Sequence, residues 1–332
     1  MKKIKVNLIS ESGIAKGQGV HSAYEDMYNA LKKNKKIYVV TNSKEESDIL
    51  HVHTIGPYSL SKFLRAKCKK VINAHLTPGS MKGSLALADL WLPLFTKYLV
   101  FFYNQADLVI AVSPQVKKEL IGIGVKKRIE VIPNSIHTEN FKKKKIDKRK
   151  YGFNRDDFVV IGAGQIQPRK GIADFIEIAR KASDAKFLWV GGRPFSVLTE
   201  DYKKSNELIK NAPKNVKFVG PVPREEMVNY YSISDLFFLP SIQETFGIVV
   251  IEAASCSLPV MLRDLDVYKN IFENNYLKAK DVNGFVKIVK RLKSDRKLYE
   301  KYRKKAKNIA NKYDRKHITE DLVKKYQEIL VK

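Results

Sequence analysis

The chain has 332 residues, of which 44% are hydrophobic and 29% are charged. This length suffices for two α/β domains, each with its own hydrophobic core. No uninterrupted apolar run reaches the roughly 18–20 residues that a membrane-spanning helix requires. The start, MKKIKVNLISES, is basic but has only a short apolar stretch, which is typical of a first β-strand and not of a signal peptide.

The formal net charge of +27 is compatible with binding to nucleic acid, with binding to an anionic membrane surface, or merely with a Lys-rich proteome. Arg supplies only 13 of the 62 basic residues, and Lys supplies the others. Base-reading proteins rely on Arg, whereas an anionic bilayer accepts diffuse Lys charge. The sequence also shows no recognised nucleic-acid-binding module. We therefore favour an anionic membrane surface, and not nucleic acid, as the partner. Cys68 and Cys256 lack metal-type spacing, which favours reduced thiols in the cytoplasm.

Strands and helices alternate in the first half of the chain. A glycine turn, residues 13–20, follows the first strand, and glycines let the backbone approach a ligand closely. The predicted strands are Lys5–Ser10, Ile37–Thr41, Ile49–Thr54, Val71–Ala74, Leu108–Ser113 and Ile129–Ile132, and the predicted helices include His21–Lys33 and Pro114–Ile121.

Three histidines lie on or just after these strands. His51 and His53 alternate, so both side chains point to one face of their strand. A metal pair has few further ligands here, and histidines of the core or of a domain interface are the simpler expectation. His75 follows a strand at its carboxyl end, where ligands gather in open α/β sheets. This position favours a role in binding, with a hydrogen-bonded loop histidine as the alternative.

Residues 58–104 combine Lys charge with apolar side chains. We expect a basic amphipathic helix at Leu60–Lys70 and an apolar, aromatic helix at Leu85–Tyr103. Such a pair suits a monotopic protein in the membrane interface, although Leu85–Tyr103 also fits a buried helix of the first domain. The residues expected to face lipid are Lys62, Phe63, Arg65, Lys67, Lys69, Lys70, Trp91, Phe95, Phe101 and Phe102.

A charge run, Phe141–Lys150, predicts the linker to the second half, and it is a further candidate for contact with lipid. The second half again alternates strands and helices, which implies two parallel-sheet domains in all. The strands are Phe158–Gly164, Lys186–Val190, Val216–Val219, Asp235–Leu239 and Val260–Leu262. The helices are Ile172–Ala182, Arg224–Ser232, Ile248–Ser255, Val267–Phe272, Val282–Lys293, Arg296–Lys312 and Ile318–Val331.

The stretch Pro240–Pro259, PSIQETFGIVVIEAASCSLP, carries the strongest chemical signal. Glu244 precedes an apolar helix and Glu252 lies inside it. A helix start has free N–H groups that suit a phosphate, and carboxylates on either side of it can accept sugar and ribose hydroxyls. Lys170, at a turn after a strand, is placed to neutralise a pyrophosphate, with Arg169 beside it. The alternative is an ordinary loop–helix connection whose carboxylates stabilise the helix start.

The pattern P-S-x-x-E-T-F-G-x-x-x-x-E-A-A resembles the signature of retaining family-4 glycosyltransferases of the GT-B fold. The resemblance covers essentially the whole chain and is strongest from Phe158 to Pro259. It implies an α/β protein with two Rossmann-like parallel-sheet domains facing a cleft. The first, residues 1–145, would bind acceptor and membrane, and the second, residues 146–315, would bind the nucleotide sugar. The last helix, residues 316–332, would cross back to the first domain.

The resemblance also implies residue roles. Glu244 would hold the donor sugar, Glu252 the ribose, and His75 would touch the transferred sugar, so that His75 and Glu244 are the catalytic candidates. A strand pattern common in the family matches Asp48, His51 and His53. The implied donor-binding residues are Gly17, Gly19, Arg169, Lys170, Val222, Glu244, Thr245, Phe246, Gly247, Ile248, Val249 and Glu252.

One position departs from the family pattern. Gln165 stands where the family has a phosphate-binding Arg, which leaves open which groups hold the β-phosphate. Lys170 is the first candidate and Arg169 the second. We expect no protein-bound metal, although Mg²⁺ assists related lipid glucosyltransferases.

More narrowly, the run G-Q-x-x-x-R-K-G-I-x-D-F and the Lys-rich charge are similar to bacterial diacylglycerol glucosyltransferases. This resemblance implies transfer of glucose from UDP-glucose to 3-glucosyl-diacylglycerol, with an α-1,2 linkage and retention at the anomeric carbon. It implies a peripheral, monotopic protein on the cytoplasmic face of the cell membrane. The alternatives are the first glucosylation of diacylglycerol, another lipid glycosyl transfer such as mannosyl transfer to phosphatidylinositol, and a basic module that binds membranes or nucleic acid without catalysis.

Overall fold

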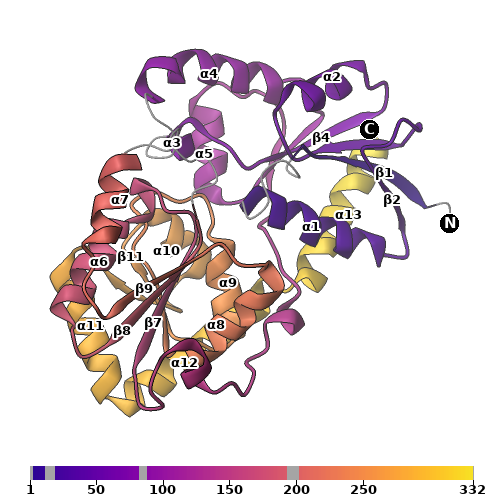
Figure 1. Cartoon of the computed structure of the whole chain (residues 1–332). Coiled ribbons are helices and arrows are strands. Elements are labelled where there is room, and N and C mark those ends of the chain that lie inside the picture. Colours follow the sequence, from indigo (N-terminus) through magenta and orange to yellow (C-terminus); the bar gives the residue numbers. More distant parts are fainter. Residues whose placement is uncertain (1–2, 12–18, 82–87, 193–201, 332) are drawn as a thin grey trace. The chain divides into compact units, whose positions relative to one another are not determined.

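The computed structural model describes residues 3–11, 19–81, 88–192 and 202–331 (Figure 1). These residues form two compact units. Of the described residues, unit 1 comprises 3–11, 19–81, 89–136 and 313–331, and unit 2 comprises 88, 137–192 and 202–312. The chain leaves unit 1 after Ile136 and returns to it at Tyr313.

Unit 1 contains a six-stranded parallel sheet in the order β2-β1-β3-β4-β5-β6. The central strands are buried apolar runs, as expected for parallel strands covered on both faces. The strands are β1 (Ile4–Ile9), β2 (Ile37–Thr41), β3 (Ile49–Val52), β4 (Lys69–Ala74), β5 (Leu108–Ala111) and β6 (Ile129–Val131). The helices are α1 (Gly19–Lys32), α2 (Pro57–Arg65), α3 (Pro78–Met81), α4 (Ala88–Tyr103), α5 (Pro114–Gly122) and the final α13 (Arg315–Val331).

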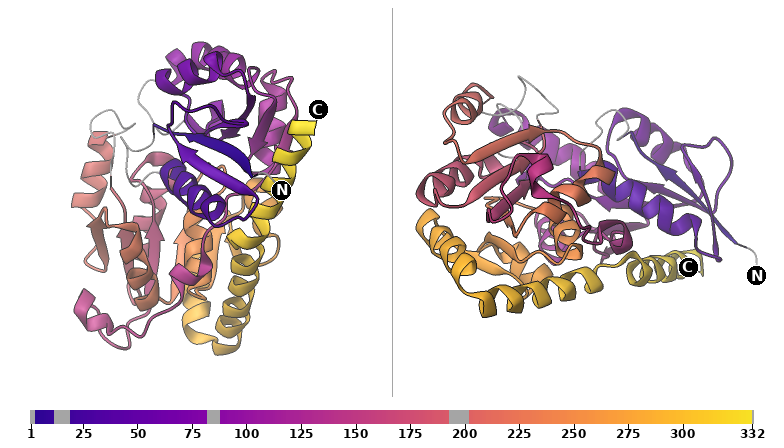
Figure 2. Two further views of the ribbon diagram at one scale, coloured as in Figure 1. Left: turned by 90° about the vertical axis from the view of Figure 1, so that its right-hand side faces the viewer. Right: turned by 60° about the horizontal axis from the view of Figure 1, so that its bottom comes forward.

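The C-terminal helix completes the core of unit 1. α13 lies beside α1 (Figure 1), and Figure 2 shows α13 in yellow from two further directions. Its buried side chains pack into the same hydrophobic cluster as residues of β1, β3, β4 and β5. They are Leu322, Val323, Tyr326 and Ile329. A short parallel bridge between Ile136 and Asp314 joins the point where the chain leaves unit 1 to the point where it returns.

Unit 2 contains a second six-stranded parallel sheet, in the order β12-β11-β10-β7-β8-β9. Its strands are β7 (Val159–Ala163), β8 (Lys186–Val190), β9 (Val216–Gly220), β10 (Leu236–Leu239), β11 (Val260–Arg263) and β12 (Leu277–Ala279). Its helices are α6 (Ile172–Lys181), α7 (Tyr202–Lys210), α8 (Met227–Ile233), α9 (Ile248–Ser255), α10 (Asp266–Phe272), α11 (Val282–Ser294) and α12 (Arg296–Lys312).

The predicted helix Leu60–Lys70 is wrong beyond residue 65. α2 ends at Arg65, and Lys69 and Lys70 begin β4, where they pair with Ile49 and Leu50 of β3. The backbone N–H of Lys70 also donates to Asp107 Oδ2, at 2.7 Å. Strand pairing therefore determines the structure of these two lysines, and this pairing leaves no trace in the local charge pattern.

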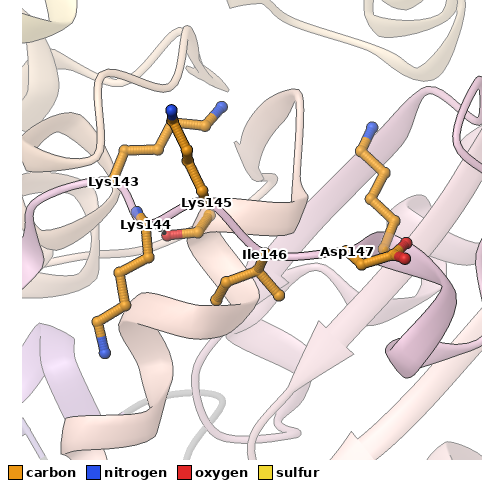
Figure 3. A pocket seen from close by; sticks show the side chains of 7 residues that line it. Lys143, Lys144, Lys145, Ile146 and Asp147 are labelled. Carbon is orange, nitrogen blue, oxygen red and sulfur yellow. Dashed lines mark hydrogen bonds between the residues drawn. The ribbon is translucent and has the colours of Figure 1, made fainter.

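The charge run Phe141–Lys150 packs on unit 2. Lys148 Nζ lies 2.6 Å from Asp235 Oδ2, and the backbone N–H of Lys144 donates to Ser232 Oγ at 2.9 Å. The side chains of residues 143–148, together with Ser232, line an open pocket of about 590 Å³ (Figure 3). None of the predicted donor-binding residues lines it.

β3 and β4 bury three histidines in unit 1. The rings of His51 and His53 are 4.9 Å apart, and those of His53 and His75 are 5.5 Å apart. All three side chains are buried, as expected for His51 and His53. Burial lowers the pKa of His51 to about 3 and that of His75 to about 4, and it lowers the pKa of His53 well below its usual value. The three rings are therefore neutral in the folded protein near pH 7.

This burial predicts a loss of stability on acidification. An unfolded chain protonates its histidines as the pH falls through about 6.5, whereas the folded chain keeps these three neutral. Each such histidine lowers the free energy of unfolding by about 1.4 kcal/mol per pH unit below that point, until the pH reaches its folded-state pKa. We expect the free energy of unfolding, measured with urea at pH 7, 6 and 5, to fall, and to fall less steeply in His53→Gln. An identical slope in the two proteins would contradict this account.

Candidate functional site

Three loops meet at the carboxyl ends of β7, β8 and β10 in unit 2. Gly171 has φ +73°, and a Cβ on it would lie 2.3 Å from the carbonyl oxygen of Pro240. Gly191 has φ +137°, and a Cβ on it would lie 2.0 Å from the carbonyl oxygen of Gly164. Only glycine permits both this backbone conformation and this closeness. The loops are therefore packed backbone against backbone at the edge of the sheet where parallel α/β proteins bind ligands.

Lys170 and Glu244 form a buried ion pair in these loops. Lys170 Nζ lies 2.5 Å from Glu244 Oε2, and the side chains are only 10% and 8% exposed. Ser241 Oγ donates to the same carboxylate oxygen at 3.4 Å. Burial opposes the charge on Glu244, but the positive charges of Lys170 and Arg169 outweigh it and hold the pKa of Glu244 below its usual value. Burial also lowers the pKa of Lys170, against the attraction of Glu244.

Arg169 fastens one loop to the next. Its backbone oxygen accepts a hydrogen bond from the N–H of Ile242 at 2.7 Å. Its side-chain Nε donates to Gln167 Oε1 at 3.1 Å, and Gln167 is buried. The predicted phosphate-binding candidates, Arg169 and Lys170, thus lie in the loop that is bonded directly to the loop carrying Glu244. Gln165 is half-buried.

The loop that carries Glu244 runs into helix α9. Phe246 is 1% exposed and anchors the loop in the core, with its ring 6.3 Å from that of Phe272. Gly247 precedes the helix in the left-handed conformation, with φ +91°. Ile248 and Val249 then form its first turn, where backbone N–H groups have no partner within the helix. Thr245 and Val249 are half-buried. A helix start of this kind suits an anion, because its free N–H groups and its positive partial charge favour one.

Glu252 lies deeper, inside α9, and is 4% exposed. Its Oε1 accepts a hydrogen bond from Arg224 Nε at 2.9 Å, and its Oε2 accepts one from Tyr231 Oη at 3.1 Å. The Arg224 guanidinium also lies 5.6 Å from the centre of the Phe141 ring. Arg224 and Tyr231 were not among the predicted site residues, because the sequence does not indicate that they contact Glu252. Each carboxylate oxygen keeps a further lone pair for a ligand hydroxyl.

The remaining donor-binding candidates are more peripheral. Val222 is half-buried in the loop after β9. Gly19 is the first residue of α1 in unit 1 and is exposed. Gly17 lies outside the described residues. Among the residues that the structure describes, no group of three or more His, Cys, Asp or Glu side chains is placed to hold a metal ion.

His75 belongs to unit 1 and follows β4. Its Nε2 lies 3.3 Å from His53 Nδ1 and 3.4 Å from Asn73 Nδ2. Leu76, the residue after His75, is anchored to α4, because Tyr103 Oη donates to the backbone oxygen of Leu76 at 2.7 Å. Buried neighbours on two strands and a helix thus fix the position of His75.

The structure removes Phe63 and Phe102 from the predicted lipid-facing set. Both are fully buried, and their rings stack on each other with centroids 5.3 Å apart. The exposed apolar side chains of α4 are instead Leu90, Leu94 and Phe101, which are 78%, 74% and 48% exposed. Their spacing of four and seven residues puts them on one face of the helix. Sequence reasoning missed Leu90 and Leu94 because it weighted the aromatic residues.

The other predicted lipid-facing residues vary in exposure. Arg65, Lys67 and Phe101 are exposed, whereas Lys62, Lys69, Lys70, Trp91 and Phe95 are half-buried. Lys62 Nζ lies 5.7 Å from the ring centre of Tyr58, and Lys70 Nζ lies 5.8 Å from that of Phe63.

Comparison with known proteins gives the family. The family model "Glycosyl transferases group 1" matches residues 143–309, and "Glycosyltransferase Family 4" matches residues 20–140. The α-galactosylglucosyldiacylglycerol synthase of Streptococcus pneumoniae is 34% identical over 327 residues, which cover 96% of this chain and 87% of that protein. The processive diacylglycerol α-glucosyltransferase of Acholeplasma laidlawii is 30% identical over 297 residues, with 87% and 88% of the two chains covered.

Solved structures agree on the fold. Anabaena HepE, determined in complex with UDP and glucose, has a TM-score of 0.80 and 19% identity, covering 98% of this chain and 99% of that one. Sucrose-phosphate synthase from Thermosynechococcus elongatus has a TM-score of 0.80 and 17% identity, covering 99% and 100%. The predicted family and two-sheet architecture are thereby confirmed. The chain belongs to the family-4 glycosyltransferases, enzymes of the GT-B fold, and carries the group 1 glycosyltransferase domain in its second half.

Proposed function

We propose that this glycosyltransferase moves glucose from UDP-glucose to 3-glucosyl-diacylglycerol, forming an α-1,2 linkage with retention at the anomeric carbon. The observation that carries the proposal is the buried Lys170–Glu244 pair beside the start of α9, because it puts a cation, a carboxylate and free N–H groups at one sheet edge. The lipid acceptor is supported by the two relatives, whose names describe glycolipid synthesis on diacylglycerol.

Galactose is the second candidate for the transferred sugar. The 34%-identical relative is named as a synthase of α-galactosylglucosyldiacylglycerol, a lipid that contains galactose. The residues of the candidate site suit either hexose, because Glu244 accepts hydrogen bonds from sugar hydroxyls whatever their configuration. UDP-galactose is therefore tested beside UDP-glucose.

In the proposed reaction, the bond between the anomeric carbon and the β-phosphate oxygen breaks, and negative charge develops on the departing UDP. Lys170, the first amides of α9 and, more weakly, Arg169 stabilise that charge. Glu244 and His75 orient the sugar, and Glu252 accepts hydrogen bonds from the ribose. The acceptor hydroxyl attacks from the same face, and its proton passes to the departing phosphate oxygen. Mg²⁺ is a candidate activator and is tested by adding a chelator.

The acceptor is a lipid, so we propose that unit 1 lies on an anionic membrane, on its cytoplasmic face. The exposed stripe Leu90, Leu94 and Phe101 would enter the interface, and nearby basic residues such as Arg65 and Lys67 would meet the lipid phosphates. In the described part of the chain, every helix falls short of the length or the apolarity needed to span a bilayer.

The proposed reaction has a direct assay. Purified protein is incubated with UDP-[¹⁴C]glucose or UDP-[¹⁴C]galactose and with micelles that contain anionic phospholipid. Diacylglycerol and 3-glucosyl-diacylglycerol are offered side by side. We expect label from UDP-glucose in a diglucosyl lipid. No transfer to any glycerolipid would overturn the proposal, and a protein that only floats with liposomes or shifts DNA would be a binding module.

Replacement of Glu244 separates sugar binding from diphosphate binding. Glu244→Gln keeps the shape of the side chain but removes its charge, so transfer is expected to fall by about 10²–10³. UDP affinity, measured by calorimetry, should be unchanged or higher, because Lys170 loses its internal partner. The matched control is Glu225→Gln, an exposed carboxylate of unit 2. A Glu244→Gln enzyme with near-normal transfer would remove the assigned role.

The membrane-binding stripe makes a separate prediction. Leu90, Leu94 and Phe101 are exchanged together for Ser, which removes apolar area that would be buried in the interface. Flotation with anionic liposomes is expected to weaken by tenfold or more, since about 1.4 kcal/mol corresponds to a factor of ten. Ile121→Ser is the control, because Ile121 is 57% exposed on α5 of the same unit. Equal binding by both variants would contradict the assignment.

A further inference from the structure

A chain of buried hydrogen bonds runs from the C-terminal helix to the end of β4 in unit 1. Tyr326 Oη on α13 lies 2.5 Å from His51 Nδ1, and His51 Nε2 lies 2.9 Å from Asn73 Oδ1. Asn73 Nδ2 then lies 3.4 Å from His75 Nε2, which is also 3.3 Å from His53 Nδ1. All five side chains are buried, so water does not replace these bonds.

The partners of His51 fix which of its ring nitrogens carries the proton. Asn73 Oδ1 is a carbonyl oxygen and can only accept, so His51 Nε2 must donate to it. A neutral imidazole has one N–H, and His51 Nδ1 is therefore bare. It accepts the hydroxyl proton of Tyr326.

Tyr326 determines the direction in which protons are donated along this series of hydrogen bonds. Its side chain is fully buried, and His51 is its hydrogen-bond partner within the described residues. If the donor and acceptor roles were reversed, His51 Nδ1 would donate to Tyr326 Oη. The hydroxyl proton of Tyr326 would then have no acceptor, which is costly in a buried site. The direction from Tyr326 through His51 to Asn73 satisfies all three groups.

The same direction determines the tautomer of His75. With Asn73 Oδ1 bonded to His51, Asn73 presents its amide N–H groups to His75 Nε2. His75 Nε2 is then an acceptor, shared with the N–H of His53 Nδ1, and His75 carries its proton on Nδ1. No residue of the described chain bonds to that Nδ1. Among the residues that the structure describes, His75 thus has an N–H donor at Nδ1 without a bonded partner, and not a lone pair.

Reversing the donor and acceptor roles in this series of hydrogen bonds would gain only one weak contact. His53 Nε2 lies 3.2 Å from Met27 Sδ, and it would donate to that sulfur if the chain were reversed. A thioether is a poor acceptor, and the exchange would leave the Tyr326 hydroxyl unpaired. The observed distances favour the direction that starts at Tyr326.

We propose that Tyr326, acting through His51 and Asn73, is a positioning residue that holds His75 in the Nδ1-protonated tautomer and so presents an N–H to an oxygen of the bound sugar nucleotide. This proposal rests on the proposed function, in which His75 touches the transferred sugar. It assigns a role in the reaction to the last helix of the chain, 251 residues beyond His75 in the sequence.

The tautomer can be measured without any enzyme assay. The chain has six histidines, so a protein labelled with ¹⁵N only in histidine gives a readable spectrum of ring nitrogens. The signals of His75 are assigned from a His75→Gln variant. In the parent protein we expect His75 with a protonated Nδ1 and a bare Nε2. A bare Nδ1 would overturn the proposal, whether or not the protein transfers glucose.

Tyr326→Phe removes the hydroxyl and keeps the ring. We expect the His75 signals to move toward the other tautomer, and kcat for transfer to fall about tenfold with KM for UDP-glucose within twofold of the parent. Tyr98→Phe is the control for the spectrum. Tyr98 donates to the backbone oxygen of Ile55, and neither residue belongs to the series of hydrogen bonds that leads to His75. His75 signals and kcat both unchanged in Tyr326→Phe would overturn the proposal. If this variant does not fold, the spectrum of the parent protein still decides.

A parent protein that transfers no sugar would remove the proposed function but would leave the tautomer measurement standing. A parent that transfers sugar while His75 has a bare Nδ1 would remove this inference alone.

Discussion

A buried cation and a buried carboxylate, Lys170 and Glu244, neutralise each other at the edge of the second sheet, and the proposed donor site is built around them. Neither Lys170 nor Glu244 would remain charged at that depth alone, because an isolated buried ion is several kcal/mol less stable than one in water. As a pair they are held in place before any ligand arrives. In the proposed reaction, a bound diphosphate would take over the positive charge of Lys170, and the sugar would take over the acceptor capacity of Glu244.

The parallel arrangement of both sheets explains where the chemistry lies. Loops that follow the strands of one sheet emerge at the same edge, so residues distant in sequence come together. In unit 2 the contact between these loops is so close that Gly171 and Gly191 are needed to permit it. In unit 1 the corresponding edge carries His75, with Leu76 fastened to Tyr103 of α4.

The sequence predicted the alternation of strands and helices and the order of the motif residues, because both are local patterns. Contacts between distant residues could not be predicted in this way. Arg224 and Tyr231 lie 28 and 21 residues before Glu252, and Tyr326 lies 275 residues after His51. The lysines at the start of β4 show the same limit, since they were predicted as a helix on charge pattern alone. The burial of Phe63 and Phe102 against each other depends on tertiary packing, which a list of apolar residues does not contain.

The return of α13 to unit 1 bears on how the protein is made. During synthesis, the strands of unit 1 emerge from the ribosome before unit 2, but the helix that supplies Leu322, Val323, Tyr326 and Ile329 emerges after unit 2. Unit 2 has all its described elements before that point and can fold while unit 1 still exposes an uncovered apolar surface. The core of unit 1 must therefore stay incomplete until α13 has been synthesised.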